Sequence, residues 1–372
     1  MTLVFISNFL NHHQFSLCQS LEKRCDQFYF IATEDISSGG CLTAIDAPFL
    51  VRYYLEEERA RAQKLIVDAD IVIFGACTND LITLRMKENK LSFIFSERFF
   101  KKGRWRRFIP STRKYVMERV AKYKNRPMYV LAASAHLPKD IELLGFPSEK
   151  CYRWGYFPEF VSYDIDRLFT QKQKNEKIRL LWVARLMPLK RPQMMVSLAK
   201  KLRNAGFDFQ IDILGDGEMS APLHKMISND KLKDYVFMRG ACTHEEVIQY
   251  MKQADIFYFT SDKREGWGVV LNEAMNNGCV VISCVDCGAT NYLVKHGKNG
   301  FVFRREKELY NLSVPLIDNF ELRKTIGIQA YHTIEELWNH EIAAERFFQI
   351  VNDIQETGSS ERYLNGPCSN HH

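Results

Sequence analysis

Short apolar runs alternate with longer amphipathic stretches along most of this chain. Ten runs have the length and the aromatic or β-branched composition of strands: residues 3–7, 28–31, 71–74, 93–95, 128–132, 179–183, 210–214, 236–238, 256–259 and 280–283. Nearly continuous apolar strands that are separated by helices indicate parallel sheets covered on both faces. The pattern therefore predicts an α/β fold with two doubly wound, Rossmann-like domains.

A polar stretch separates the two predicted domains. Residues 169–177 show no apolar periodicity, so we expect a linker there, with one domain over residues 1–168 and a second over 177–337. Apolar residues at helical spacing predict a last helix over about 338–357: Ile342, Ala343, Phe347, Ile350 and Val351. The polar residues that follow, 358–372, are expected to be disordered.

The composition is that of a folded protein. Of the 372 residues, 46% are apolar and 26% are charged. No segment approaches the ~20 apolar residues of a membrane span, and the N-terminus has no signal-peptide pattern. The ten cysteines form no disulfide framework, and the lone C-x-x-C of Cys284 and Cys287 lacks the second pair that a zinc site needs. We therefore expect reduced thiols in a cytoplasmic protein, with this C-x-x-C in a plain loop.

Two glutamates, Glu265 and Glu273, stand eight positions apart at a predicted junction between a loop and a helix. A glycine follows the first, and the second lies in an apolar-periodic segment that ends at Gly278. A helix start presents unbonded N–H groups that favour phosphate, and a carboxylate on either side can bind sugar hydroxyls. The segment therefore indicates a nucleotide-sugar site, and the alternative is a surface helix with two solvated glutamates.

This segment resembles the donor-site signature of retaining GT-B glycosyltransferases of the group 1 or GT4 family, with Trp267 where that family usually has Phe. The resemblance implies that Glu265 contacts the transferred sugar and that Glu273 contacts the ribose of the nucleotide. From the loop and helix start we expect the donor diphosphate to meet the backbone of four residues: Gly266, Trp267, Gly268 and Val269. The resemblance also implies a GT-B fold, in which two Rossmann-like domains face a central cleft, the first binds the acceptor, and the last helix packs back on the first.

Three other loops of the second half follow predicted strands, where doubly wound folds bind their ligands. Arg185 ends the first of these strands and Lys190 follows in its loop, and together they resemble the family's diphosphate clamp; the alternative is two solvated cations. Gly215 follows the next strand, in a tight turn that lets a nucleotide approach the backbone. Ala241 follows the third and resembles the loop that contacts the base.

The first half offers histidines and a carboxylate. His12 and His13 follow the first strand and resemble a family subset with an Asn-His-His-Gln loop; either could orient the acceptor hydroxyl or the donor phosphate, or only shape the loop. Family members often have a histidine after the fourth strand, where this chain has Glu97 and Arg98, so we expect one of these to position the acceptor. His136 is a weaker candidate.

Positive charge is concentrated in one segment. Residues 98–126 hold twelve Lys or Arg and one Glu, against a net charge of +6 for the whole chain, and aromatic residues are interleaved with the cations. This mixture suits an anionic membrane surface, and the residues that we expect to face a membrane or a lipid-linked acceptor begin the segment: Arg98, Lys101, Lys102, Arg104, Trp105, Arg106 and Arg107. The alternatives are a solvated helix face and a nucleic-acid site, and against the latter no nucleic-acid module is recognised. We expect a peripheral protein at the inner face of the membrane.

Metal-dependent glycosyltransferases use Asp-x-Asp, and this chain has two such strings, residues 68–70 and 164–166. The first enters a strand and the second lies beside the expected linker, so neither is at a strand's C-terminal end. We therefore predict transfer without a metal or another cofactor, with cations and amides stabilising the leaving diphosphate.

The function predicted is that of a retaining hexosyltransferase. It would move a sugar from a nucleotide-diphosphate sugar to a glycan or polyprenyl-diphosphate-linked acceptor in cell-surface polysaccharide biosynthesis. The resemblance implies retention of anomeric configuration, with the acceptor attacking on the leaving-group face, and Glu265 would position the sugar rather than form a covalent intermediate. The alternatives are a non-catalytic nucleotide-sugar-binding protein and a sugar-nucleotide epimerase of the same fold.

Overall fold

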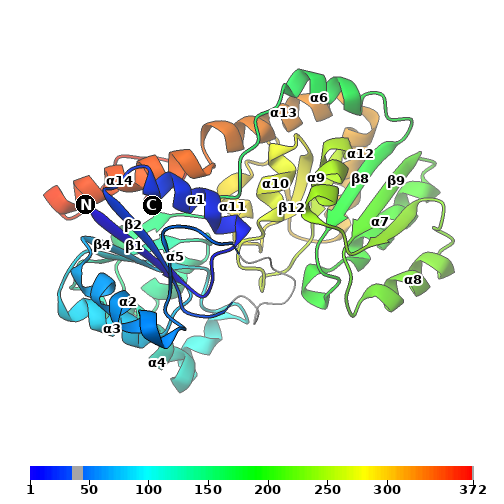
Figure 1. Ribbon diagram of the computed structural model, residues 1–372. Coiled ribbons are helices and arrows are strands. Elements are labelled where there is room, and N and C mark those ends of the chain that lie inside the picture. Colours follow the sequence, from blue (N-terminus) through cyan, green and yellow to red (C-terminus); the bar gives the residue numbers. More distant parts are fainter. Residues whose placement is uncertain (36–44, 371–372) are drawn as a thin grey trace. The chain divides into compact units, whose positions relative to one another are not determined.

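The computed structural model describes residues 1–35 and 45–370. Their contacts form two units, residues 1–159 with 337–372 and residues 160–336. Each unit is built on a parallel sheet with helices packed on it (Figure 1). The prediction of two doubly wound, Rossmann-like halves is therefore confirmed.

The sheet of the first unit has the order β3-β2-β1-β4-β5-β6-β7, and all its described pairings are parallel. Its strands are β1 (Thr2–Ser7), β2 (Gln27–Ala32), β3 (Leu50–Arg52), β4 (Ile71–Phe74), β5 (Ser92–Ser96), β6 (Met128–Ala132) and β7 (Cys151–Arg153). Its helices are α1 (His12–Glu22), α2 (Glu56–Asp68), α3 (Asn79–Lys87), α4 (Pro110–Arg119), α5 (Leu137–Glu142) and α14 (His340–Thr357), with short 3-10 turns η2 (Arg104–Phe108), η3 (Ala121–Tyr123) and η4 (Ser148–Lys150). Helix α14 packs on α1, while α2 packs on α3 (Figure 1).

The sheet of the second unit has the order β10-β9-β8-β11-β12-β13, again with parallel pairings. Its strands are β8 (Ile178–Val183), β9 (Phe209–Leu214), β10 (Val236–Gly240), β11 (Ile256–Phe259), β12 (Val280–Cys284) and β13 (Phe301–Phe303). Its helices are α6 (Ile165–Lys172), α7 (Gln193–Asn204), α8 (Ser220–Asn229), α9 (His244–Gln253), α10 (Val270–Asn276), α11 (Thr290–Leu293), α12 (Lys307–Asp318) and α13 (Phe320–Glu336), with the turn η5 (Pro188–Lys190). Helix α7 packs with α8 and α12, and α10 packs with α9 and α13.

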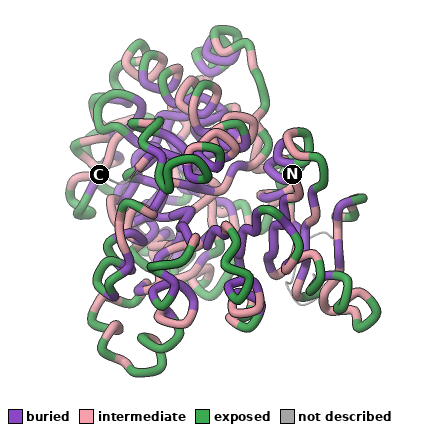
Figure 2. The backbone as a smooth tube through the Cα atoms, turned by 90° about the vertical axis from the view of Figure 1, so that its left-hand side faces the viewer, coloured by how far each residue is buried: buried purple, intermediate pink, exposed green. Residues whose placement is uncertain are grey.

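Four inner strands are buried along their whole length. Strands β4, β6, β11 and β12 have no residue outside the buried class, and Figure 2 shows such buried stretches inside the molecule, with exposed stretches on turns and outer helix faces. A strand that is buried on both faces is fixed by packing, so the residues that follow it are held at one edge of the sheet. The polar side chains after these strands are the ones that can form a rigid site.

The boundary between the units differs from the predicted one. Residues 165–172 form helix α6 and belong to the second unit, which begins at Phe160, so the expected linker at 169–177 is wrong over its first half. Lys172 is buried, and its ammonium group donates to the carbonyl oxygens of Met251 (3.3 Å) and Ala254. The sequence alone does not distinguish a solvated lysine from a buried one whose ammonium group bonds to carbonyl oxygens, which is why the segment resembled a linker.

The expected disorder of residues 358–372 is also wrong for the described part of that tail. Cys368 and Ser369 are buried, and Asn370 forms an antiparallel bridge with Tyr152 on the edge strand β7. The Arg153 N–H donates to the Ser369 carbonyl at 2.8 Å, and Arg362 pairs with Asp353 of α14. The tail is ordered by backbone pairing with a sheet edge, which apolar periodicity does not reveal.

Arg85 ties helix α3 to the end of α2 and to β5. Its side chain is fully buried, and burial lowers its pKa to about 10, so it remains charged near neutral pH. The guanidinium donates to five backbone carbonyls: those of Ile66, Val67, Ala69, Asp70 and Leu91. We expect Arg85→Leu to lower the free energy of unfolding by about 2–5 kcal/mol, because buried carbonyls lose their donors. Thermal unfolding followed by circular dichroism checks this, and a Tm unchanged within 1–2 °C, roughly the shift of under 1 kcal/mol, would contradict it.

Candidate functional site

The loops after β8, β9 and β10 are joined at the C-terminal edge of the second sheet. The Leu186 N–H donates to the Asp216 carbonyl at 2.9 Å, and the Gly215 N–H donates to the Gly240 carbonyl at 2.7 Å. These bonds bring the predicted residues Arg185, Gly215 and Ala241 to one edge, as their positions after predicted strands indicated. Arg185 and Ala241 are exposed there, and Arg185 forms no ion pair within the part of the chain that the structure describes.

Lys190 and Glu265 form the central pair of this edge. Their side chains come from η5 and from the loop after β11, and the Lys190 ammonium donates to a Glu265 carboxylate oxygen. Only 17% of the lysine and 13% of the glutamate side chain is exposed. The two residues that the sequence assigned to diphosphate and to sugar therefore contact each other in this structure.

Two residues with no assigned role in the sequence analysis hold Lys190 in place. The Thr260 hydroxyl, which accepts from the indole of Trp182 at 2.8 Å, donates to the Lys190 carbonyl at 2.6 Å. Arg191 has a left-handed backbone (φ 52°), and its guanidinium donates to the Thr260 and Ser261 carbonyls and contacts the Cys284 sulfur at 2.9 Å. The sequence offered one signal for Arg191, namely its position next to Lys190. The hydrogen-bond partners of Arg191, however, lie about 70 or more residues away along the chain and were not predictable.

The loop from Glu265 to Val269 is shaped by packing. Gly268 has φ +92°, and a Cβ there would overlap the ring of Phe259. The Trp267 side chain is buried and donates to the Asn272 side-chain oxygen at 2.9 Å, so this residue supports the loop from within. Among the described residues, the N–H groups of Val269 and Val270 have no acceptor, whereas those of Leu271 and Asn272 bond back to Gly268 and Val269. Free N–H donors at this position suit an anionic ligand.

Glu273 lies in the first turn of α10 with 10% of its side chain exposed. Its Oε1 is buried and makes no hydrogen bond with the described residues, and the His244 ring nitrogen Nδ1 lies 3.8 Å from it. Burial raises the pKa of Glu273, and His244 opposes this rise. A buried carboxylate oxygen without a donor is costly unless a ligand supplies one, which is the chemistry of a sugar hydroxyl. The sequence analysis did not single out His244.

The glycines after β9 have an internal role. Gly215 has φ +126°, and a Cβ would overlap the Ala184 carbonyl; at Gly217, φ is +149° and a Cβ would lie 2.6 Å from the Leu186 carbonyl. The sequence analysis expected this turn to let a nucleotide approach the backbone. The structure gives close packing of two loops as a sufficient reason for both glycines.

At the matching edge of the first sheet, helix α1 begins with the two predicted histidines. The Asn11 side chain caps this helix by accepting from the His13 N–H at 3.0 Å. His12 is exposed, His13 is half-buried, and their rings are 3.8 Å apart. The loop is thus a capped helix start in place of a glycine-rich loop.

Glu97 follows β5 and is held by two neighbours. Its carboxylate accepts from the Lys101 ammonium. Burial, followed by the charge of Glu97 and a hydrogen bond to it, raises the pKa of Tyr156 well above its usual value, so this tyrosine stays protonated. His136, the weaker candidate, lies one residue before α5 and is half-buried.

Arg98 does not face outward as expected. It is 8% exposed and pairs with Asp140 of α5 at 3.3 Å, and Arg104 pairs with the same carboxylate at 3.0 Å. The prediction of Arg98 as a membrane contact is therefore wrong, because an internal carboxylate 42 residues away binds it. The other members of the expected surface are exposed or half-buried: Lys101, Lys102, Arg104, Trp105, Arg106 and Arg107. Large apolar side chains are exposed beside them, namely Trp105 (59%), Phe108 (71%) and Tyr115 (49%).

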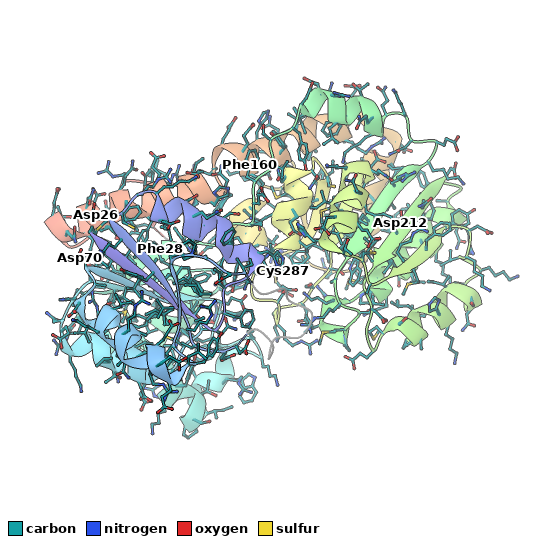
Figure 3. The ribbon with its side chains drawn as sticks, viewed as in Figure 1. Asp26, Phe28, Asp70, Phe160, Asp212 and Cys287 are labelled. Carbon is teal, nitrogen blue, oxygen red and sulfur yellow. The ribbon has the colours of Figure 1, made fainter. Side chains whose placement is uncertain are left out.

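Both Asp-x-Asp strings have structural roles. Asp70 accepts from the Thr2 N–H at 2.7 Å and, with Asp26, lies at the N-terminal end of the first sheet (Figure 3), opposite the edge that carries the site. Asp164 caps α6, and Asp166 pairs with Lys324. Among the described residues, a cluster with metal-ligand spacing is formed by His332, Glu335 and Glu336 of helix α13.

Residues 164–333 match the family described as glycosyl transferases group 1. The chain carries a group 1 glycosyltransferase domain. Over 166 residues it is 30% identical to AmsK, an amylovoran biosynthesis glycosyltransferase of Erwinia amylovora, covering 43% of this chain and 39% of that protein. Over 205 residues it is 22% identical to a poly(ribitol-phosphate) alpha-N-acetylglucosaminyltransferase of Staphylococcus aureus, covering 51% of this chain and 40% of that one. The chain thus spans about two fifths of the length of these relatives.

Similarity to solved structures extends over nearly the whole chain. The crystal structure of Anabaena HepE in complex with UDP has a TM-score of 0.72 at 16% identity, covering 95% of this chain and all of that one. The sucrose-phosphate synthase of Thermosynechococcus elongatus has a TM-score of 0.64 at 15% identity, covering 96% and 99%. This likeness establishes the GT-B fold predicted from the sequence. Within the described residues, the helices lack the combination of length and hydropathy needed to cross a bilayer.

Proposed function

We propose that this protein is a retaining glycosyltransferase of the GT4 type, moving a sugar from a nucleotide-diphosphate donor to a glycan or lipid-linked acceptor in cell-surface polysaccharide synthesis. The observation that carries the proposal is the Lys190–Glu265 pair together with the buried Glu273 Oε1 that has no hydrogen-bond donor among the described residues, both in the loops and helix start of a group 1 domain. Two relatives named above act in amylovoran synthesis or on poly(ribitol-phosphate), and HepE binds UDP, which supports the donor and acceptor classes.

Each group has a part that follows from its position. Breaking the bond between sugar and diphosphate leaves negative charge on the diphosphate, and Arg185, Lys190 and the free N–H groups of Val269 and Val270 would stabilise it. Glu273 would accept from the ribose hydroxyls. Glu265, already bonded to Lys190, would hold the transferred sugar so that the acceptor attacks on the leaving-group face, with no covalent intermediate. These fixed groups would supply the charge stabilisation without a metal. We therefore expect the reaction to be independent of metal ions.

Glu273 gives the direct test of the donor site. Purified protein in EDTA should be stabilised by one class of nucleotide, with UDP, GDP, ADP and dTDP and their sugars compared. At about 100 times Kd the gain is about 2.7 kcal/mol, roughly a 5–10 °C rise in Tm. Glu273→Gln should weaken binding about ten- to a hundredfold, because the ribose loses a charged acceptor.

The control is Glu306→Gln, an exposed glutamate of the same unit, which should keep the full shift. Absence of a shift with every nucleotide, with and without Mg²⁺, would overturn the donor-site proposal. A shift without turnover against any acceptor glycan would instead favour a non-catalytic nucleotide-sugar-binding protein. Anomeric configuration of a product, read by NMR, tests retention separately.

We further propose that the exposed aromatic residues of η2 and α4 and the cations around them, the basic-aromatic surface, dock on an anionic membrane. The surface consists of Lys102, Trp105, Arg106, Arg107, Phe108, Arg113, Lys114 and Tyr115. Each cation near an anionic bilayer contributes about 1 kcal/mol, and the aromatic rings suit the headgroup region.

The combined change Trp105→Ala and Phe108→Ala should lower co-sedimentation with phosphatidylglycerol vesicles about tenfold or more, since two rings leave the bilayer interface. Leu364→Ala is the matched control, because Leu364 is an apolar residue 92% exposed in the tail of the same unit. Equal binding of the double variant and the wild type, or equal binding to neutral vesicles, would contradict the membrane proposal.

A further inference from the structure

A pocket of about 370 Å³, lined by charged, polar and aromatic side chains, lies at the C-terminal edge of the first sheet. Its walls come from the residues that follow three strands, Asn8 after β1, Gly75 after β4 and Glu97 after β5, and from helix α4. All its lining residues belong to the first unit. The volume is within the range of about 300–1,000 Å³ that is usual for small-molecule sites.

The pocket has an excess of positive charge. Arg98, Lys101 and Arg119 line it with the one carboxylate of Glu97. Arg98 and Lys101 pair with Asp140 and Glu97, respectively. Arg119 differs from both, because it forms no ion pair with any residue in the described ranges 1–35 and 45–370.

Arg119 is held in place while its charge stays unmatched. It is 3% exposed, and its guanidinium donates to the carbonyl oxygens of Gly75 and Cys77 (2.9 Å) and to the Asn79 side chain (3.3 Å). All of these acceptors are neutral. A buried cation whose hydrogen bonds go to neutral groups attracts an anion more strongly than a solvated lysine does.

The same pocket contains features that suit a sugar ring. Gln14 is 5% exposed, and its side-chain oxygen is buried with no donor among the described residues. Phe9, Phe95 and Tyr156 contribute aromatic surface to the lining. An unsatisfied amide oxygen beside a carboxylate and aromatic rings can accept from sugar hydroxyls while the rings cover the sugar's apolar face.

We propose that this pocket binds the terminal sugar of the acceptor and that this sugar carries an anionic group, a carboxylate or a phosphate, which lies against Arg119. Glu97 accepts a hydrogen bond from a hydroxyl of that sugar and so acts as a positioning residue. Lys101 and Tyr156 hold the Glu97 carboxylate in place. This inference rests on the proposed function only in calling the sugar an acceptor. The sugar can bind in the pocket whether or not a nucleotide-sugar is bound to the second unit.

The test is ligand-observed NMR titration of the full chain with three probes of one sugar: methyl glucoside, methyl glucuronide and glucose 6-phosphate. At least one anionic probe should bind about tenfold or more tightly than the neutral one, since charge-assisted hydrogen bonds are the stronger ones. The preference should weaken between 50 and 500 mM salt. Glycerol 3-phosphate, a lipid headgroup phosphate with neither sugar nor acyl chains, separates a sugar anion from a lipid phosphate: binding as tight as that of glucose 6-phosphate would overturn the sugar assignment.

Variants locate the binding. Arg119→Met should remove the preference for the anion, and Arg61→Met, an exposed arginine of helix α2 outside the pocket, should keep it. Gln14→Leu should weaken all sugar probes while keeping their ratio, which gives a second reading if Arg119→Met fails to fold. Equal affinity for neutral and anionic probes, or no binding of any probe, overturns the inference. A nucleotide-dependent Tm shift in the same protein would still support the proposed function, so the two failures are distinguishable.

Discussion

Replacing Lys190 by alanine should lower kcat about 100- to 1,000-fold. The leaving diphosphate gains negative charge as the sugar bond breaks, and a fixed donor aimed at such charge typically accounts for a factor of this size. Lys190 is suited to the task because it is mostly buried, and its backbone carbonyl is held by Thr260. Initial rates with a saturating donor and acceptor, once the thermal-shift screen has identified the donor, give the measurement.

The structure also predicts a loss of stability in this variant, which must be separated from the loss of activity. Lys190→Ala leaves the Glu265 carboxylate, 13% exposed, without its cation, which should cost about 1–3 kcal/mol. The double variant Lys190→Met and Glu265→Gln removes both charges, so it should recover most of the stability while remaining inactive. Lys200→Ala, an exposed lysine of α7 that pairs with Asp230, should keep kcat within about twofold because exposed pairs contribute little. A kcat for Lys190→Ala within about fivefold of wild type would contradict the diphosphate role.

The strands show how far the sequence alone can predict this fold. All ten predicted runs are strands, because a strand buried on both faces must be apolar along its length. The three strands that were missed, β3, β7 and β13, each have three residues and lie at a sheet edge. A three-residue edge strand carries too short a pattern to distinguish it from a loop.

The candidate site divides in a similar way. Arg185 was found because it follows a predicted strand, and parallel strands bring their C-terminal ends to one edge. The Glu265–Glu273 segment was found because it stands at a predicted loop–helix junction and resembles a family signature. The partner of each side chain was not predictable, since Lys190 and Glu265 are 75 residues apart and Arg98 turns inward to an aspartate 42 residues away. The apolar pattern determines where the chain is buried, while such polar pairings depend on side-chain geometry that only the structure supplies.

Replacing Gly215 by alanine should lower the free energy of unfolding by roughly 2–5 kcal/mol, a Tm decrease of roughly 5–15 °C. Two costs add at this residue. Its φ of +126° is unfavourable for any side chain, and a Cβ would overlap the carbonyl oxygen of Ala184, which is backbone and cannot rotate away. The hydrogen bond from the Gly215 N–H to Gly240 prevents the loop from moving without a further loss.

Gly206→Ala separates these two costs, because Gly206 has φ +82° in the same unit and a Cβ added there would have no neighbouring atom within 4 Å. It should cost about 1–2 kcal/mol, the backbone strain alone. The difference between the two variants, measured by thermal or urea unfolding, is then the cost of forcing apart the loops after β8 and β9. Those loops carry Arg185 and hold the edge on which the diphosphate would bind, so Gly215→Ala should also weaken nucleotide binding at temperatures where the protein is still folded. Equal costs for the two variants would mean that the loops are not packed this closely. Close approach by a nucleotide, rather than loop packing, would then explain the glycine at position 215.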